Sequence, residues 1–260
     1  MEEHVTTFKL HLPTLRVMKI LDYIASSPSG LTLSQISNKT GYPKSTITPI
    51  LKTLAYENYI HCNEDTLIYN IGRELFILGN TYNETSTTLE LIKEQMNHIV
   101  QICNETCHLG VLAGPQIMYL QKITGTQPIQ LISSIGKKLP AYATALGKAL
   151  LFDYSEKELS ILLGEHLMPL TPYTLTSISD LYHDIHRDKI NYFTYEKEEI
   201  TEHARCIARP LRVDGKIVAA ISVSFLTFNS SSQKIQLIKK TLNKYAVIIE
   251  KLMHSRGFSY

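Results

Sequence analysis

The first sixty residues alternate between short segments with helical apolar spacing and breaks rich in serine, proline and glycine. Residues 14–26 place an apolar side chain at every third or fourth position, which predicts a helix, and residues 27–30 end it. Thr32 and Gln35 have the spacing of a capping box, so a second short helix begins there and ends at Gly41. The inward-facing residues of a third helix follow at Ile47, Ile50, Leu51 and Leu54.

Two short apolar segments after the third helix predict a hairpin. Residues 59–62 and 67–70 read as strands, and residues 63–66 form the turn between them. Three helices followed by a hairpin predict a winged helix-turn-helix, with Gly72 at the end of the wing. In this motif the second helix crosses the DNA backbone and the third enters the major groove.

Pro49 interrupts the third helical segment on the side opposite Ile47 and Leu51. A proline inside a helix costs about 3 kcal/mol, whereas one in the first turn costs little. We therefore expect the regular helix to start late, near Thr46; the alternative is a helix that starts at Pro43 and kinks near Ser45. In both cases the ring faces outward, either to touch a thymine methyl group or as a tolerated surface irregularity.

Charge supports a DNA-binding function for this region. Residues 14–54 contain five basic side chains and one acidic one, a local net charge of +4. Such a patch neutralises phosphates, although a solvated helical face would carry the same charges. We expect Arg16 and the wing to bind phosphates. The residues expected to face the groove are Lys44, Ser45, Thr46, Thr48 and Lys52.

The remainder of the chain predicts a second, mixed domain. A short helix at 73–82 and a polar stretch at 83–88 suit an interdomain connector. A long helix begins near Leu89, and a closing helix spans 233–253. Between them the pattern predicts strands at 108–113, 117–123 and 129–134, a helix at 144–152, and a hairpin of 205–213 with 216–226. The fold class is therefore α+β.

Composition restricts the compartment and the partners. The chain has 260 residues, 44% hydrophobic and 19% charged, and a net charge of only +2. The first 13 residues lack the apolar segment of a secretory signal, and the longest apolar run, 217–226, is too short to span a bilayer. Four cysteines are too few for a disulfide scaffold. We expect a cytoplasmic protein with reduced thiols and no membrane partner.

Candidate catalytic and metal-binding patterns are weak. The sequence TALGKA lacks the glycine at 142 and the hydroxyl residue at 149 that a phosphate-binding loop needs. Cys103 and Cys107 have no metal-ligand spacing and are expected in the core. Cys206 has His203 three residues away, but no orienting group or oxyanion hole is recognisable. We predict no catalytic residue, metal or cofactor.

Ser222 and Ser224 lie two residues apart on an otherwise apolar predicted strand. Side chains at this spacing face the same side of a sheet. Two hydroxyls on such a strand either line a pocket or face solvent, and alternation alone permits both.

Five blocks of the sequence together resemble bacterial transcription regulators of the IclR type. LRVMKILDYI, GLTLSQISNKTGYPKSTI and YNIGRELFILG resemble their amino-terminal domain, and KKLPAYATALGKALL and CIARPLRVDGKIVAAISVS resemble their effector-binding domain. The resemblance implies a DNA-binding domain at 10–72, a linker helix at 73–88 and a GAF/profilin-like α/β effector domain at 89–260. It also implies homodimers or homotetramers on double-stranded operator DNA, and small effectors that are frequently organic acids.

The same resemblance assigns effector-binding roles to particular positions. They are Gly136, Tyr142, Glu196, Ala204, Cys206, Ser222 and Ser224. The chain departs from the family pattern in four places: Pro49 replaces a basic or polar residue, Glu196 an aspartate, and Tyr192 and His203 glycines. The predicted function is an effector-controlled transcription regulator. The alternatives are a small-acid enzyme or sensor with a vestigial helix-turn-helix, and a protein-binding module.

Overall fold

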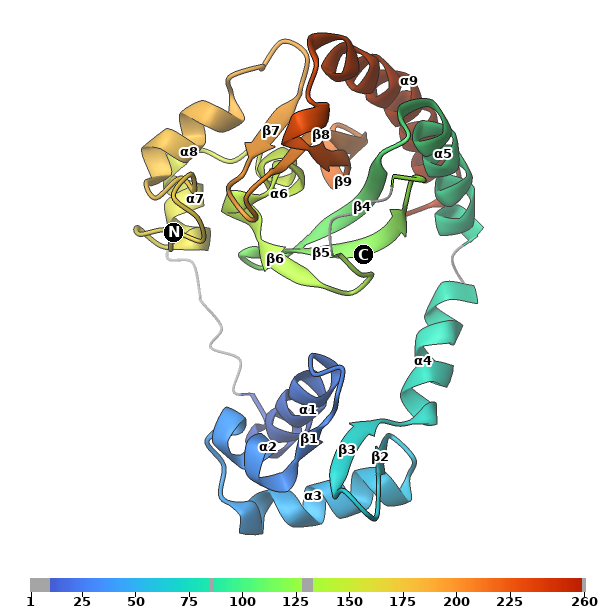
Figure 1. The fold of residues 1–260 in the computed structure, drawn as a ribbon, viewed down its shortest axis with the longest axis vertical. Coiled ribbons are helices and arrows are strands. Elements are labelled where there is room, and N and C mark those ends of the chain that lie inside the picture. Colours follow the sequence, from blue (N-terminus) through green and yellow to red (C-terminus); the bar gives the residue numbers. More distant parts are fainter. Residues whose placement is uncertain (1–9, 85–86, 128–132, 259–260) are drawn as a thin grey trace, which may run out of the picture. The chain divides into compact units, whose positions relative to one another are not determined.

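The computed structural model describes residues 10–84, 87–127 and 133–258, which form two compact units divided between residues 85 and 86. Figure 1 shows the amino-terminal unit in blue to cyan and the carboxy-terminal unit in green to red. Each unit has its own hydrophobic core.

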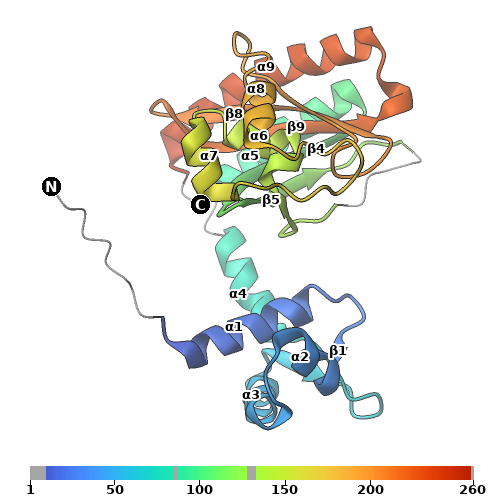
Figure 2. The same cartoon turned by 90° about the vertical axis from the view of Figure 1, so that its left-hand side faces the viewer.

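The amino-terminal unit is a winged helix-turn-helix, as predicted. Helices α1 (Leu12–Ala25), α2 (Leu33–Thr40) and α3 (Lys44–Tyr56) pack together (Figure 2) around a core that includes Ile20, Ile36 and Ile47. A three-stranded sheet of order β1-β3-β2 completes the unit. Its strands are β1 (Leu31–Thr32), β2 (Ile60–Cys62) and β3 (Ile68–Ile71), and helix α4 (Arg73–Glu84) follows. The sequence pattern missed β1 because two residues carry no periodicity.

Local hydrogen bonds explain where α2 and the wing turn begin and end. The Thr32 hydroxyl accepts the Gln35 N–H at 3.4 Å and the Gln35 side chain accepts the Thr32 N–H at 2.8 Å, which confirms the capping box. Gly41 ends α2 with a φ of 73°, a conformation that glycine adopts without strain. In the wing, Asn63 Oδ1 accepts the N–H groups of Asp65 and Thr66.

The start of α3 corrects the prediction of a late-starting helix. The helix begins at Lys44, and the Pro43 carbonyl accepts the N–H groups of Thr46 and Ile47 at 3.0 and 3.2 Å. The late start near Thr46 is therefore wrong, and the helix starts directly after Pro43, close to the alternative; the kink near Ser45 stays a prediction. Pro49 is exposed in the second turn of a helix that continues to Tyr56. We attribute this tolerance to Ile47, whose burial in the core fixes the preceding turn.

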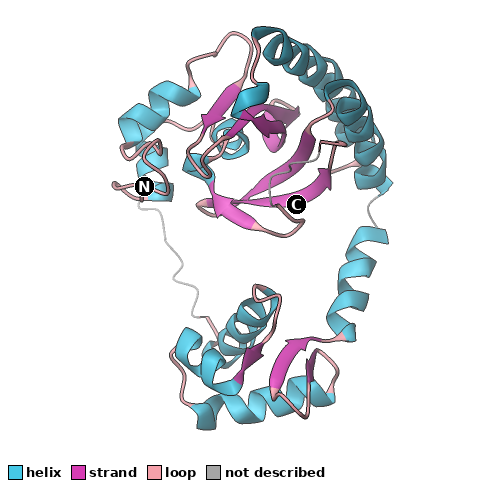
Figure 3. Ribbon diagram, viewed as in Figure 1, coloured by secondary structure: helices cyan, strands magenta, loops and turns pink. Residues whose placement is uncertain are grey.

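The carboxy-terminal unit contains one curved, antiparallel sheet of order β6-β5-β4-β9-β8-β7. Figure 3 shows its strands in magenta, curling around α6 (Ala145–Leu150). The strands are β4 (Thr106–Ala113), β5 (Gln116–Ile123), β6 (Lys138–Pro140), β7 (Thr194–Lys197), β8 (Ala204–Val213) and β9 (Lys216–Leu226). The predicted α+β class and the long hairpin of β8 with β9 are confirmed.

Helices cover both faces of this sheet. Helices α5 (Thr87–Cys103) and α9 (Ser232–Arg256) lie side by side on one face and bury a cluster that includes Met96, Val223 and Ile249. On the other face, α6 packs with α7 (Glu156–Leu163) and α8 (Ile178–Ile185). Short 3-10 turns lie at Ala141–Ala143 and Thr227–Asn229.

The predicted elements of this unit agree with the structure except in its middle. The predicted strand at 129–134 lies mostly outside the described residues, and the described Ser133 and Ser134 are not in a strand. The sequence pattern missed β6, β7, α7 and α8. Gly147 lets the start of α6 pack closely on the preceding turn, because a Cβ on Gly147 would lie 2.2 Å from the Ala141 carbonyl oxygen.

Candidate effector cavity and DNA-contacting helix

The strand register aligns the candidate polar residues of the sheet on one face. Glu196 of β7 is paired with Cys206 of β8, and Cys206 is paired with Ser224 of β9. Ser222 is paired with His108 of β4 on its other side. Because directly opposite residues project to the same face, these side chains share the face that α6 covers.

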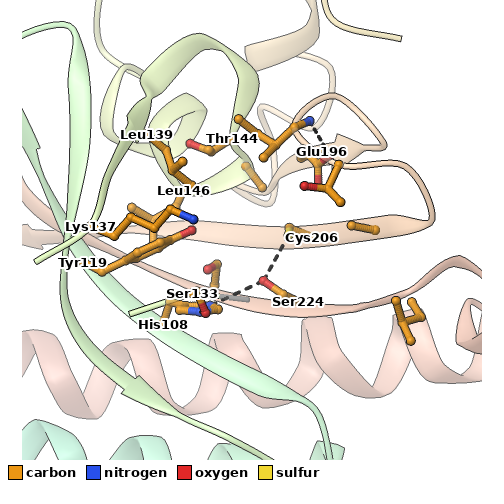
Figure 4. A pocket seen from close by; sticks show the side chains of 16 residues that line it. His108, Tyr119, Ser133, Lys137, Leu139, Thr144, Leu146, Glu196, Cys206 and Ser224 are labelled. Carbon is orange, nitrogen blue, oxygen red and sulfur yellow. Dashed lines mark hydrogen bonds between the residues drawn. The ribbon is translucent and has the colours of Figure 1, made fainter. Parts of the chain in front are cut away.

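These side chains line a cavity of about 530 Å³ between the sheet and the start of α6 (Figure 4). Its wall is largely apolar, with polar groups from five strands and two loops, which is the usual composition of a small-molecule site. The lining residues are His108, Tyr119, Ser133, Lys137, Leu139, Thr144, Ala145, Leu146, Glu196, Ile200, Thr201, Ala204, Cys206, Ser222, Ser224 and Leu226.

Glu196 is a buried acid at the cavity wall, with only 3% of its surface exposed. Its Oε1 accepts the backbone N–H groups of Glu199 at 2.7 Å and Ile200 at 3.4 Å, which fixes the carboxyl group. Burial raises the pKa of Glu196 to about 7 despite these hydrogen bonds. Near neutral pH this group therefore exchanges between an acceptor-only carboxylate and an acid that also donates.

A chain of hydrogen bonds joins Cys206 to the far wall of the cavity. The Cys206 thiol donates to Ser224 Oγ at 3.0 Å, and Ser224 Oγ lies 3.4 Å from His108 Nδ1 (Figure 4). His108 Nε2 lies 2.8 Å from Ser133 Oγ. Burial, and secondly the neighbouring Glu196, raise the pKa of Cys206 well above its ordinary value, which disfavours the nucleophilic thiolate.

His203 does not form a catalytic pair with Cys206. Its side chain is 79% exposed, and its ring nitrogen lies 3.9 Å from the Glu198 carboxylate. His203 therefore does not act as the base of a thiol nucleophile at Cys206.

Lys148 of the TALGKA sequence is engaged beside the cavity wall. It is fully buried on α6, and its Nζ donates to Glu199 at 2.6 and 2.8 Å and to Asp184 at 2.7 Å. The same Glu199 donates its backbone N–H to Glu196. The lysine therefore joins α6 and α8 to the loop that holds Glu196.

The exposed side of α3 presents most of the residues predicted to face DNA. Lys44, Ser45 and Lys52 are exposed around Pro49. Thr46 and Thr48 are half-buried at the flanks, and the Thr48 hydroxyl donates to the Lys44 carbonyl at 2.8 Å. On α1, the Arg16 guanidinium lies 5.6 Å from the centre of the Tyr42 ring.

Sequence models of two protein domains cover most of the chain. The carboxy-terminal domain of the bacterial transcriptional regulator IclR matches residues 82–251, and the IclR helix-turn-helix domain matches residues 14–63. The first match alone spans more than half of the chain. The chain belongs to the IclR family.

Relatives in the IclR family agree along nearly the whole length. The chain is 29% identical over 240 residues to the HTH-type transcriptional regulator XynR of Escherichia coli K12, covering 92% of this chain and 95% of XynR. It is 30% identical over 222 residues to the regulator BhcR of Paracoccus denitrificans, covering 85% and 79% of the two chains. The protein is therefore an IclR-family transcriptional regulator with a helix-turn-helix and an effector-binding domain.

Solved structures of IclR proteins share the fold. A regulator from Alicyclobacillus acidocaldarius superposes with a TM-score of 0.84 at 18% identity, covering 94% of this chain and 99% of that one. An IclR homolog from Microbacterium hydrocarbonoxydans, solved in complex with 4-hydroxybenzoate, has a TM-score of 0.77 at 21% identity, with 93% and 98% covered.

The cavity contains five of the seven effector positions that the IclR resemblance implied. They are Glu196, Ala204, Cys206, Ser222 and Ser224. Gly136 and Tyr142 do not line the cavity. Gly136 is exposed in a turn and donates its N–H to the Tyr119 carbonyl at 2.8 Å, while the Tyr142 hydroxyl donates to the Met168 carbonyl at 2.7 Å.

Other candidates of the IclR chain are separated from the cavity. Arg205 and Arg209 lie near Cys206 on β8, but neither lines the cavity: Arg205 donates to Ser230 at 2.9 Å, and Arg209 donates to the Asn243 side chain. Cys103 and Cys107 are buried in the core beneath α5 and α9, as predicted. Across the described ranges, no group of three His, Cys, Asp or Glu side chains could hold a metal ion, and no helix is long and apolar enough to cross a membrane.

Sequence reasoning missed His108, Tyr119 and Ser133 as cavity residues. His108 of β4 directly follows the core residue Cys107 in the sequence. The hydroxyls near it in space come from β9 and from the loop before β6, and the pairing of β4 with β9 brings the first of these close. The sequence signal that could have identified His108 is a histidine at an inward-facing position of a predicted strand.

Proposed function

We propose that the protein represses or activates transcription by binding operator DNA through residues 10–72, under the control of a small carboxylate bound in residues 89–260. Residues 73–88 would link the two parts, and the active form would be a homodimer or homotetramer. The observation that carries this proposal is the cavity with the row Glu196, Cys206 and Ser224 on its wall. The curated relatives are transcriptional regulators, and we propose no catalytic role for these residues.

A carboxylate suits the cavity because its free polar groups include hydrogen-bond donors. Within the described part of the chain the Ser222 hydroxyl makes no hydrogen bond, although the residue is buried. Lys137 supplies a cation at the wall. Charge-assisted hydrogen bonds from such donors are the strong ones. The ligand of the structurally similar Microbacterium protein, 4-hydroxybenzoate, is itself a carboxylate.

DNA binding is assigned to the exposed side of α3 and to Arg16. Lys44 and Lys52 lie two turns apart and would approach the DNA with Ser45, Thr46 and Thr48. Pro49 lies among them, where its ring offers an apolar contact to a thymine methyl group. Binding of the carboxylate would change the spacing of two such helices in the oligomer and so change operator affinity.

Thermal shift with a series of small carboxylic acids tests the effector assignment. A bound acid raises the melting temperature by mass action. The rise should disappear in Ser222→Ala and Ser224→Ala and persist in the matched control Ser179→Ala, which changes an exposed serine of α8. Equal stabilisation of all four proteins would place the acid outside this cavity.

Gel shifts on DNA selected by the protein from a random pool test the DNA assignment. Binding should weaken steeply between 50 and 200 mM salt, with retained sequence preference, as expected for a protein that makes roughly 6–10 phosphate contacts. Binding that is indifferent to salt and sequence would favour a vestigial helix-turn-helix.

A further inference from the structure

His108 is held between two hydroxyl groups at the inner wall of the cavity. The residue is buried, its Nε2 lies 2.8 Å from Ser133 Oγ, and its Nδ1 lies 3.4 Å from Ser224 Oγ. Its ring stacks on Tyr119 with 4.6 Å between the ring centres. Both ring nitrogens are therefore engaged, and the ring plane is fixed by packing.

The ring is neutral at physiological pH. Burial, and secondly the charge of Lys122, lower the pKa of His108 to about 3. A neutral imidazole has one N–H donor and one acceptor nitrogen, so one hydroxyl must donate to the ring and the other must accept from it. Lys122, opposite His108 in the β4–β5 register, donates to the Ser133 carbonyl at 2.8 Å and fixes that partner.

The neighbouring thiol indicates the direction of the hydrogen bonds without ligand. Cys206 donates to Ser224 Oγ, which leaves the Ser224 hydroxyl proton to point at His108 Nδ1. The ring proton then lies on Nε2 and is donated to Ser133. In this arrangement Ser224 has no proton to offer to a ligand, although it lines the cavity.

We propose that His108 is a positioning residue that changes from the Nε2–H to the Nδ1–H tautomer when a carboxylate enters the cavity. The Nδ1–H then donates to Ser224 Oγ, the Ser224 hydroxyl donates to the carboxylate, and the Ser133 hydroxyl donates to Nε2. The ring carries one proton in both states and exchanges it with solvent. This inference rests on the proposed function, because it takes the effector to be a carboxylate.

The exchange favours an acceptor ligand. The bond between Ser224 and Nδ1 only reverses its direction, and it is long at 3.4 Å and joins neutral groups in both states. The bond that is gained has an ionised acceptor, and such bonds are roughly twice as strong as neutral ones. The exchange thus favours a carboxylate over the corresponding amide, whose oxygen is a neutral and weaker acceptor.

Nitrogen-15 NMR of the histidine rings in the full-length protein reads the tautomer directly. The His108 signal is assigned by its loss in His108→Phe, which keeps a ring against Tyr119 and removes both nitrogens, or by its loss in His108→Gln if the phenylalanine variant does not fold. The probes are pyruvate and 4-hydroxybenzoate, each compared with its amide. We expect Nε2–H without ligand and with the amides, and Nδ1–H with whichever acid raises the melting temperature of the wild type.

The possible results separate this inference from the proposed function. An acid that binds while His108 stays Nε2–H would overturn the tautomer change and leave the carboxylate effector standing, and Nδ1–H in the free protein would overturn it likewise. Failure of both probes and of a wider series of small carboxylic acids to bind would overturn both the tautomer change and the carboxylate effector.

A folded His108→Phe should bind the acid about three- to tenfold more weakly, the effect of one lost hydrogen bond. Unchanged affinity would contradict the role of His108, and if this variant does not fold, the wild-type tautomer decides.

Discussion

Replacement of Lys148 by methionine should destabilise the carboxy-terminal unit far more than replacement of an exposed lysine such as Lys93. Lys148 is fully buried on α6, and its ammonium group contacts Glu199, Asp184 and the Tyr195 carbonyl, the last at 3.2 Å. Methionine preserves the length and volume of the side chain. The substitution therefore removes the charge and leaves the two carboxylates facing each other with little water.

The magnitude follows from the burial of the partners. Burial raises the pKa of Glu199 even with the lysine beside it, so removal of the lysine leaves an acid that is costly to ionise. Breaking a buried ion pair by removing one partner costs about 3–5 kcal/mol. Native proteins are stable by only about 5–15 kcal/mol, so this is a large share of the total. At roughly 2–4 °C per kcal/mol for a unit of this size, the melting temperature should fall by about 6–20 °C.

Calorimetry of the full-length protein at pH 7 measures this loss. Lys93→Met is the matched control, because Lys93 forms an exposed pair with Glu90 at 3.3 Å on α5 and should cost less than about 1 kcal/mol. Adding Glu199→Gln to Lys148→Met should restore part of the loss, since it removes a charge that lacks a partner. A Lys148→Met protein as stable as Lys93→Met would refute the reasoning.

Four further substitutions test other parts of the structure. Burial raises the pKa of Glu196 from 4.5 to about 7, so between these pH values the native state binds a proton that the unfolded chain has released. The free energy of unfolding should therefore fall as the pH rises from 4.5 to 7. In denaturant titrations the stability of Glu196→Gln should fall less over this window, and an identical pH dependence would contradict the assignment. Thr32→Ala should cost about 1 kcal/mol in thermal unfolding by removing the capping box, and no loss would mean that the cap is dispensable. Pro49→Ala should stabilise the amino-terminal unit by about 1–3 kcal/mol in the same assay. Unchanged or lower stability would show that Pro49 carries no cost at this position. Gly147→Ala should destabilise the other unit, because its Cβ would meet the Ala141 carbonyl at 2.2 Å; an unchanged melting temperature would mean that this turn yields easily.

Periodic and capping patterns predicted the elements whose burial is one-sided. Helices α5 and α9 each bury a continuous apolar stripe, and the hairpin of β8 and β9 turns at Asp214 and Gly215, which both have positive φ. The missed helix α7 in fact has the same signal as α2, a capping box between Ser155 and Glu158. Its short, eight-residue length gives too little periodicity for recognition by apolar spacing alone.

The cavity was only partly predictable because it depends on strand order. Alternation places Ser222 and Ser224 on one side of a strand but does not say which side is covered. The covered side is the one on which α6, the helix that follows β6 in the chain, packs against β8 and β9. His108 joins them through the antiparallel pairing of β4 with β9, more than one hundred residues apart in sequence. The start of α3 differs from the prediction because the cost of a proline inside an isolated helix was applied to Pro49. Packing of α3 against the core outweighs that cost.

Operator affinity measured with and without a carboxylate that binds the cavity tests the central claim most directly. Fluorescence anisotropy would use DNA selected by the protein, the wild type, and the double variant Ser222→Ala/Ser224→Ala. The account predicts that the acid changes the DNA dissociation constant of the wild type about fivefold or more, a typical coupling between two sites, and leaves that of the variant unchanged. An acid that binds the wild-type cavity without altering its DNA affinity would contradict the account.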